Sequence, residues 1–159
     1  MATQEKNDAL QMLKNAIRSK HPEKFYIFYG EEIFLLQHYL GQMHRMILDE
    51  LTESFNYHRF NNENFELRDF ADAVENLPMM AERTLVQVDD IDLFKLPEDS
   101  RNKIMDILMD IPTYCTLVFV YETVEFKPDI IITDIAGPVT GFYNQTVVVN
   151  LFRGIVGNK

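Results

Sequence analysis

Apolar segments that alternate with amphipathic helices limit the folds open to this chain more than any other feature. Residues 24–30 (KFYIFYG), 83–90 (RTLVQVDD) and 115–121 (CTLVFVY) are apolar almost without a break at their centres. Such runs are typical of strands that are buried on both faces, as in parallel sheets. Helices between the strands supply the crossovers that parallel strands require. We therefore predict an α/β fold, a three-layer sandwich with a central parallel sheet.

The remaining elements follow from the spacing of apolar residues and from helix-stopping prolines. Apolar residues three or four positions apart define each helix, and Pro78 and Pro112 end two of them. A shorter alternating segment predicts one more strand. The predicted elements are helices over residues 5–19, 31–51, 67–77 and 97–111 and a further strand over residues 54–60.

Composition excludes several classes of protein. A chain of 159 residues fits one core of ordinary size, and no apolar run approaches the roughly 20 residues of a membrane-spanning helix. The formal net charge of −10 opposes independent DNA binding, which needs clustered lysine and arginine. Cys115 lies in an apolar run and is expected to be a buried hydrophobe rather than a catalytic thiol. The N-terminus has no secretory signal pattern, so we expect a cytoplasmic protein.

The chain changes character after Pro128. From residue 130 to residue 159 only Asp134, Arg153 and Lys159 are charged, and no helical periodicity remains. We predict one domain over residues 1–128 and an aberrant tail over residues 129–159. Three alternatives stay open for the tail: a hairpin, a poorly ordered end, or the product of a shifted reading frame.

Gly30 ends the first predicted strand and precedes a helix, which is where a phosphate-binding loop would begin. That loop has the pattern G-x-x-x-x-G-K-[ST], but residues 35–37 are Leu, Leu and Gln. Glu31 and Glu32 place two negative charges at the helix N-terminus, where they complement the helix dipole and repel a triphosphate. The segment is a degenerate phosphate loop, and we expect no cofactor and no catalytic residues.

Asp89, Asp90 and Asp92 follow the predicted strand 83–90. In an ATPase one of these carboxylates would hold Mg²⁺. Without an upstream lysine we favour a solvated acidic loop, although metal binding by three nearby carboxylates stays open. The four histidines offer no pair at the spacing of a helical metal site, so we predict no metal centre.

Three segments, in order and spacing, resemble a known family. They are residues 26–40 (YIFYGEEIFLLQHYL), 76–94 (NLPMMAERTLVQVDDIDLF) and 108–122 (LMDIPTYCTLVFVYE). Over residues 24–127 the chain resembles the N-terminal domain of the delta subunit of the bacterial DNA polymerase III clamp loader. The resemblance implies an AAA+-like fold, a degenerate P-loop NTPase domain that has lost nucleotide binding.

The same resemblance implies the function and partners. A delta subunit is a non-catalytic part of the DNA polymerase III holoenzyme, a DNA-directed DNA polymerase, in DNA replication. It binds the sliding clamp (beta subunit), opens the clamp's ring, and works with the other clamp-loader subunits. DNA would be met only through the assembly, and no membrane is implied.

The resemblance also implies a contact site in the loop before the strand 83–90. Carried over by position, the clamp-binding residues are Leu77, Pro78, Met79 and Met80. Family members often have Leu-Phe or Phe-Phe at the last two places, so the Met-Met pair is a departure. Flexible thioethers suit an adaptable apolar groove, and the alternative is that both methionines fold back under the sheet.

Two rival functions stay open from the residues alone. One is a working P-loop-type ATPase or phosphotransferase with an atypical phosphate loop, using Asp89 or Asp90 for Mg²⁺. The other is a flavodoxin-like or receiver-type domain, although the first strand here lacks the acidic cluster of such domains.

Overall fold

A computed structural model describes residues 2–123 and 146–150 of the chain, and the side chains of residues 9–123. The strands form one parallel sheet in the order β2-β3-β4-β1-β5. The elements are α1 Ala2–Ser19, β1 Phe25–Tyr29, α2 Ile33–Ile47, α3 Glu53–Asn56, β2 Tyr57–Phe60, α4 Leu67–Glu75, β3 Thr84–Asp89, the 3₁₀ helix η1 Leu93–Lys95, α5 Glu98–Met109, β4 Cys115–Tyr121 and β5 Thr146–Asn150.

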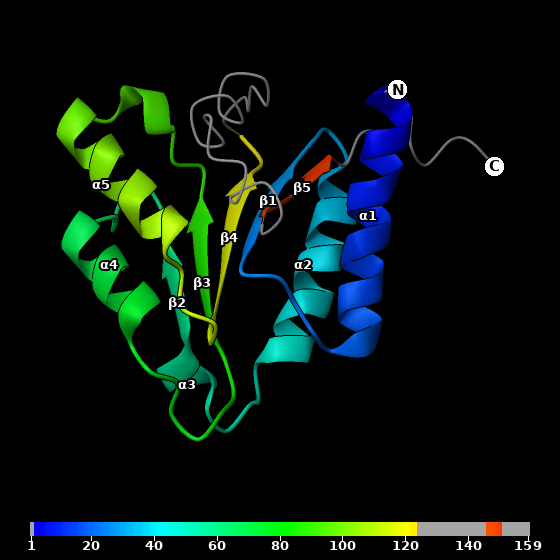
Figure 1. The fold of residues 1–159 in the computed structure, drawn as a ribbon, viewed down its shortest axis with the longest axis horizontal. Coiled ribbons are helices and arrows are strands. Elements are labelled where there is room, and N and C mark those ends of the chain that lie inside the picture. The colour runs from blue at the N-terminus through cyan, green and yellow to red at the C-terminus, as the bar shows by residue number, and fades with distance from the viewer. Residues whose placement is uncertain (1, 124–145, 151–159) are drawn as a thin grey trace.

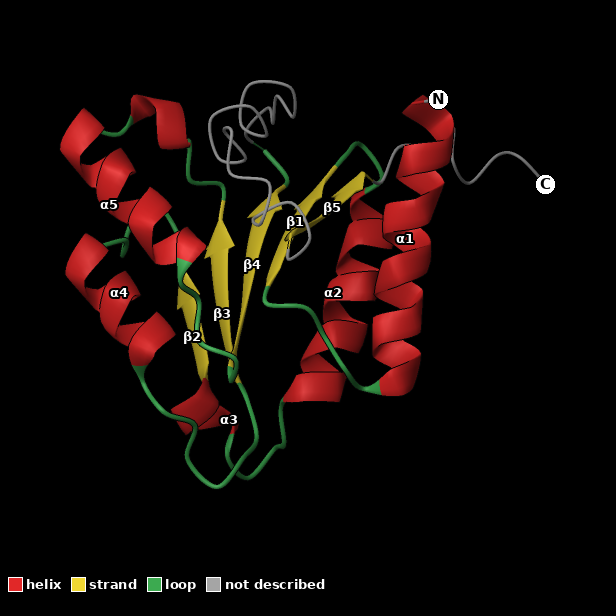
Figure 2. Cartoon of the chain, in the orientation of Figure 1, coloured by secondary structure: helices red, strands yellow, loops and turns green. Residues whose placement is uncertain are grey.

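Helices cover both faces of the sheet, as predicted for a three-layer α/β sandwich. Helices α1 and α2 lie on one face and α4 and α5 on the other (Figure 1 and Figure 2). Side chains of β1 alternate between the two cores: Tyr26 and Phe28 pack toward α1 and α2, while Phe25 and Ile27 pack toward α4 and α5. Burial of each such side chain stabilises the fold by about 1.5–3 kcal/mol, so the unbroken apolar strands hold both helical layers.

The helix predicted over residues 31–51 is shorter than expected. Helix α2 ends at Ile47, and Leu51 lies outside it with 87 % of its surface exposed. The Asp49 carboxylate accepts a hydrogen bond from the Leu51 N–H at 2.8 Å, and a turn replaces the last helical turn. Short polar side chains compete with the helix in this way, so the predicted end of this helix at residue 51 was wrong.

The strand predicted over residues 54–60 is in part a helical turn. Helix α3 (Glu53–Asn56) precedes β2, which begins only at Tyr57. The third predicted helix also ends early, because α4 stops at Glu75. A residue before proline disfavours helical backbone, so Leu77, which precedes Pro78, lies in the following loop. The first difference adds a helical turn and the second lengthens a loop, both at the same end of the sheet.

The part of the predicted tail that the structure describes is a strand. β5 pairs with β1 in parallel, with Thr146 opposite Phe25 and Asn150 opposite Tyr29. A parallel neighbour far along the chain was not predicted, and the rest of the tail, for which three alternatives stayed open, lies outside the described residues. The domain boundary at residue 128 stays a prediction.

Among the described helices, none has the length and apolar character needed to cross a bilayer.

Candidate functional site

The degenerate phosphate loop lies at the carboxyl end of β1. Gly30 adopts φ = 136°, a backbone conformation that side-chain-bearing residues rarely adopt, and α2 begins three residues later. Leu36, which stands where the pattern has lysine, is fully buried in the core beneath α1 and α2. This position therefore packs the fold, and no cation points from it toward the loop.

The acids after β3 are held by hydrogen bonds from the chain itself. Asp90 Oδ1 accepts from the N–H groups of Glu122 and Thr123 at 2.8 and 3.0 Å. Asp92 Oδ1 accepts from the Phe94 N–H at 3.0 Å and caps η1. Both carboxylates therefore join the loop after β3 to its neighbours.

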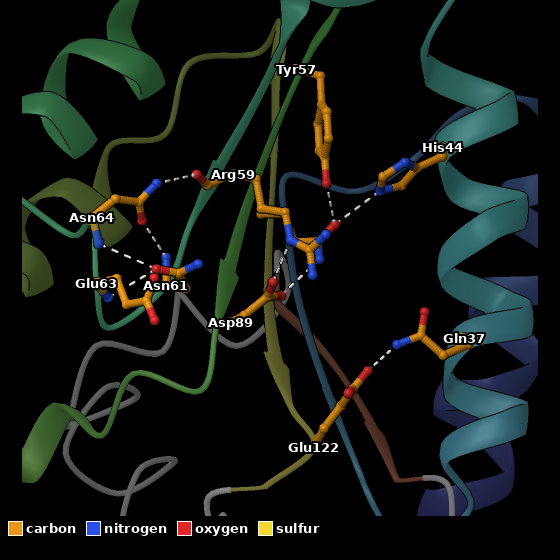
Figure 3. A network of polar contacts seen from close by, with 10 residues as sticks. Gln37, His44, Tyr57, Arg59, Asn61, Glu63, Asn64, Asp89 and Glu122 are labelled. Carbon is orange, nitrogen blue, oxygen red and sulfur yellow. Dashed lines mark hydrogen bonds and ion pairs between the residues drawn. The ribbon is translucent and has the colours of Figure 1, made fainter.

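Asp89 belongs to a polar network on the α2 face of the sheet (Figure 3). Its carboxylate accepts from Arg59 Nε at 2.5 Å and from the Gln87 amide at 2.7 Å. The Gln87 amide oxygen in turn accepts from the Tyr57 hydroxyl at 2.8 Å and lies 2.9 Å from Nε2 of His44. The network links β2 and β3 to α2. A nucleotide site would need free carboxylates at this place, and the Asp89 carboxylate is already paired.

Two side chains of this network have raised pKa values, one because of burial and the other because of its ion pair. Burial, the largest cause, raises the pKa of Tyr57 to about 12, so its hydroxyl stays a hydrogen-bond donor. The hydrogen bond to Asp89 raises the pKa of Arg59. Within residues 9–123, no group of three or more His, Cys, Asp or Glu side chains is arranged to hold a metal ion.

Cys115 is buried in β4, as predicted for a small hydrophobe. Burial raises the pKa of its thiol to about 11, the opposite of what a nucleophilic cysteine requires.

The opposite end of the sheet carries the loop that joins α4 to β3. Leu77, Met79 and Met80 are exposed there, and Pro78 is half-buried. Met80 is 93 % exposed and has φ = 53°. The two methionines therefore point to solvent rather than fold back under the sheet. Their role as clamp-binding residues stays a prediction.

Two further apolar side chains at this end were missed by the sequence analysis. Leu51 and Phe55 are exposed; Leu51 precedes α3 and Phe55 belongs to it, and α3 lies beside the α4–β3 loop (Figure 1). The Asn56 side chain on α3 bonds to the backbone of Met79 and so joins the two segments. We name Leu51, Phe55, Leu77, Met79 and Met80 the apolar end surface.

The missed residues gave no separate signal in the sequence. Leu51 continues the apolar period of α2, and Phe55 fits the alternation of a strand, so both patterns predicted burial. A smaller exposed apolar pair, Ile33 and Phe34, lies on the first turn of α2.

A sequence model of the family DNA polymerase III, delta subunit, matches residues 26–135. The chain belongs to the DNA polymerase III delta subunit family. The matched residues correspond to the AAA+-like N-terminal domain of that subunit. The match continues past residue 128, where we placed the boundary, and covers the degenerate phosphate loop, the acids after β3 and the α4–β3 loop.

Two solved structures are similar in fold to this delta-family chain. The Bacillus subtilis DNA clamp loader delta protein superposes with a TM-score of 0.66 at 19 % identity, over 88 % of this chain and 41 % of that one. A DNA polymerase III gamma subunit-related protein from Thermotoga maritima gives 0.58 at 16 % identity, over 87 % of this chain and 45 % of that one. The chain thus spans less than half of either protein. No curated protein matches its sequence.

Proposed function

We propose that this domain binds the sliding clamp (beta subunit) through the apolar end surface and opens one interface of the clamp's ring. The observation that carries the proposal is the exposure of five large apolar side chains from two segments at one end of the sheet. Neighbouring exposed apolar residues mark protein interaction sites. The loop that supplies three of them is the one that the family resemblance assigned to the clamp.

The size of the surface matters to the proposal. Burying Met79 and Met80 alone would contribute roughly 3–6 kcal/mol, which is comparable with the cost of association. Leu51, Phe55 and Leu77 lie at the same end and add apolar area to the contact. The clamp contact therefore draws on both segments rather than on the methionine pair alone.

The wider setting follows the family. Other clamp-loader subunits are the remaining partners, and DNA is met through that assembly, in the cytoplasm and away from membranes. The net charge of −10 supports the inference that other subunits bind the DNA, because phosphate binding requires basic side chains.

Three features argue against the rival, a working ATPase. Leu36 replaces the phosphate-binding lysine and is buried, and Glu31 and Glu32 carry negative charge at the start of α2. Asp89 is paired with Arg59, and Asp90 caps backbone N–H groups. We expect titration calorimetry with Mg-ATP to give no binding heat, and binding at micromolar concentration would favour the ATPase.

The clamp contact is tested by the double variant Met79→Asp, Met80→Asp. Two carboxylates in an apolar contact should weaken binding of the purified sliding clamp at least about 100-fold, measured by surface plasmon resonance. Thermal unfolding should change little, because both side chains are exposed.

A matched control is the double variant Met12→Asp, Met109→Asp, which makes the same changes at exposed methionines on α1 and α5. It should bind the clamp as the wild type does. Equal binding by the wild type and the Met79/Met80 variant, with the fold intact, would show that the contact lies elsewhere.

A further inference from the structure

One buried side chain fixes the backbone of the proposed clamp-binding loop. Asn56, the last residue of α3, is 1 % exposed. Its Oδ1 accepts from the Met79 N–H at 2.7 Å, and its Nδ2 donates to the Met79 carbonyl at 2.9 Å. The same Nδ2 lies 3.1 Å from the Thr52 carbonyl oxygen. A single amide thus pairs with both backbone groups of Met79, as a neighbouring strand would.

The residues on the two sides of Met79 differ in how well they fix the loop backbone. Pro78 restricts the backbone before it. Met80, after it, holds φ = 53°, a conformation that a long side chain without local hydrogen bonding rarely adopts. Because most alternatives are more favourable for Met80 itself, a free loop would leave this conformation. Asn56 therefore holds the loop in a geometry that the loop sequence does not select.

We propose that Asn56 is a positioning residue that sets the clamp-binding loop in its binding conformation before the clamp arrives. The inference rests on the proposed function. Asn56 is also attached to the second half of the apolar end surface, because Phe55 precedes it on α3 and Leu51 precedes Thr52. The Asn56 amide therefore fixes the α4–β3 loop relative to the segment that carries Leu51 and Phe55. Less conformational entropy is then lost when the clamp binds.

A positioning role predicts a change in the rate of association with the clamp rather than in the rate of dissociation. If the binding-competent loop becomes a minor population, the apparent affinity falls in proportion to that population, and fewer encounters succeed. Once bound, the loop makes the same contacts, so release is unchanged. A side chain that only contacts the clamp would instead change the dissociation rate.

The variant Asn56→Asp tests this with almost no change of shape. It keeps an acceptor for the Met79 N–H but sets an oxygen against the carbonyls of Met79 and Thr52. In the full chain, with the purified sliding clamp as probe, we expect the association rate constant to fall about tenfold and the dissociation rate constant to change less than about twofold. If this variant does not fold, Asn56→Ser, which also loses the pairing, should show the same pattern.

Asn76→Asp is the matched control, because Asn76 is exposed in the same loop and gains the same charge. It should associate at the wild-type rate. Hydrogen exchange adds a second readout: the Met79 amide should exchange faster in Asn56→Asp, whereas the Leu85 and Val86 amides of β3 should not change.

The outcomes separate this inference from the proposed function. Slower association with unchanged release supports the positioning role. Unchanged association, a loss carried by dissociation, or the same slowing in Asn76→Asp overturns it. If Met79→Asp, Met80→Asp loses clamp binding while Asn56→Asp binds normally, only the positioning role fails. If the wild type does not bind the clamp, the proposed function fails, and the positioning role fails with it.

Discussion

The acidic side chains at one end of the parallel sheet and the apolar side chains of the apolar end surface at the other differ in what they contact. At the carboxyl ends of the strands, Asp89 and Asp90 are engaged by Arg59 and by backbone N–H groups. At the amino ends, Leu51 and Met80 are almost fully exposed. Open α/β sheets usually bind ligands at the carboxyl ends. In this family member the polar groups there stabilise the fold, and the surface that we propose for a partner lies at the other end.

The largest expected effect comes from restoring the lysine of the phosphate-loop pattern. Leu36→Lys places an ammonium group in a fully apolar, buried position, so we expect the free energy of unfolding to fall by about 4 kcal/mol or more. Urea denaturation measures the loss. Phe34→Lys, at an exposed position on the same helical turn, should change stability by less than about 0.5 kcal/mol. A stable Leu36→Lys variant that binds Mg-ATP would show that the carboxyl end of the sheet can still form a nucleotide site.

Asp90→Ala should separate stability from binding. The change leaves the N–H groups of Glu122 and Thr123 without their acceptor, so we expect a loss of about 1–3 kcal/mol in the free energy of unfolding. Clamp affinity, measured on the folded variant, should not change. Asp90→Asn keeps an acceptor oxygen and should lose less. An affinity loss without a stability loss would place a binding role at the carboxyl end.

Leu51→Ser makes the converse test at the amino end. Its side chain is exposed, so stability should change by less than about 0.5 kcal/mol. If Leu51 belongs to the clamp contact, affinity should fall about fivefold to tenfold, equivalent to about 1–1.4 kcal/mol. Met109→Ser, at an exposed position on α5, serves as the control. Unchanged clamp affinity in Leu51→Ser would exclude Leu51 from the contact.

The smallest expected effect is a pH dependence that arises at β2. Burial lowers the pKa of His58, and its Nε2 atom has no hydrogen-bond partner within the described residues. The unfolded chain therefore binds a proton at higher pH than the native chain does. Stability is retained above the unfolded pKa of roughly 6.5 and is lost as the pH falls from there toward the lowered native value.

The measurement is urea denaturation between pH 7.5 and pH 5. His58→Gln should flatten the curve in this window, since the neutral amide does not titrate. His38→Gln, at an exposed position on α2, should leave the slope unchanged. An identical slope in all three proteins would assign the pH dependence to other groups.

Part of this fold was predictable because the information is local. The apolar runs at β1, β3 and β4 indicate doubly buried strands, and Pro112 marks the end of the segment that contains α5. The absent lysine at position 36 is equally visible in the sequence. The α4–β3 loop could be assigned to a partner only through the family resemblance, because a methionine pair in a loop has no distinctive chemistry.

Other features depend on residues far apart in the chain. Leu51 and Phe55 keep the periodicity of buried elements, and only the Asp49 turn and α3 move them to the surface. The pairing of Asn56 with Met79 spans 23 positions. β5 joins the sheet beside β1 from the far end of the sequence. The spacing of apolar residues along the chain gives no information about such contacts.

The layered α/β architecture and the loss of the phosphate-binding lysine can be read from the amino-acid sequence, because each depends on the chemistry of neighbouring residues. Folding of the chain is needed before the acids after β3 find their hydrogen-bond donors and before two separate segments form one apolar end surface. The physical reason is that hydrogen bonds and exposure depend on distances in space, and those distances are set when the two cores close around the sheet.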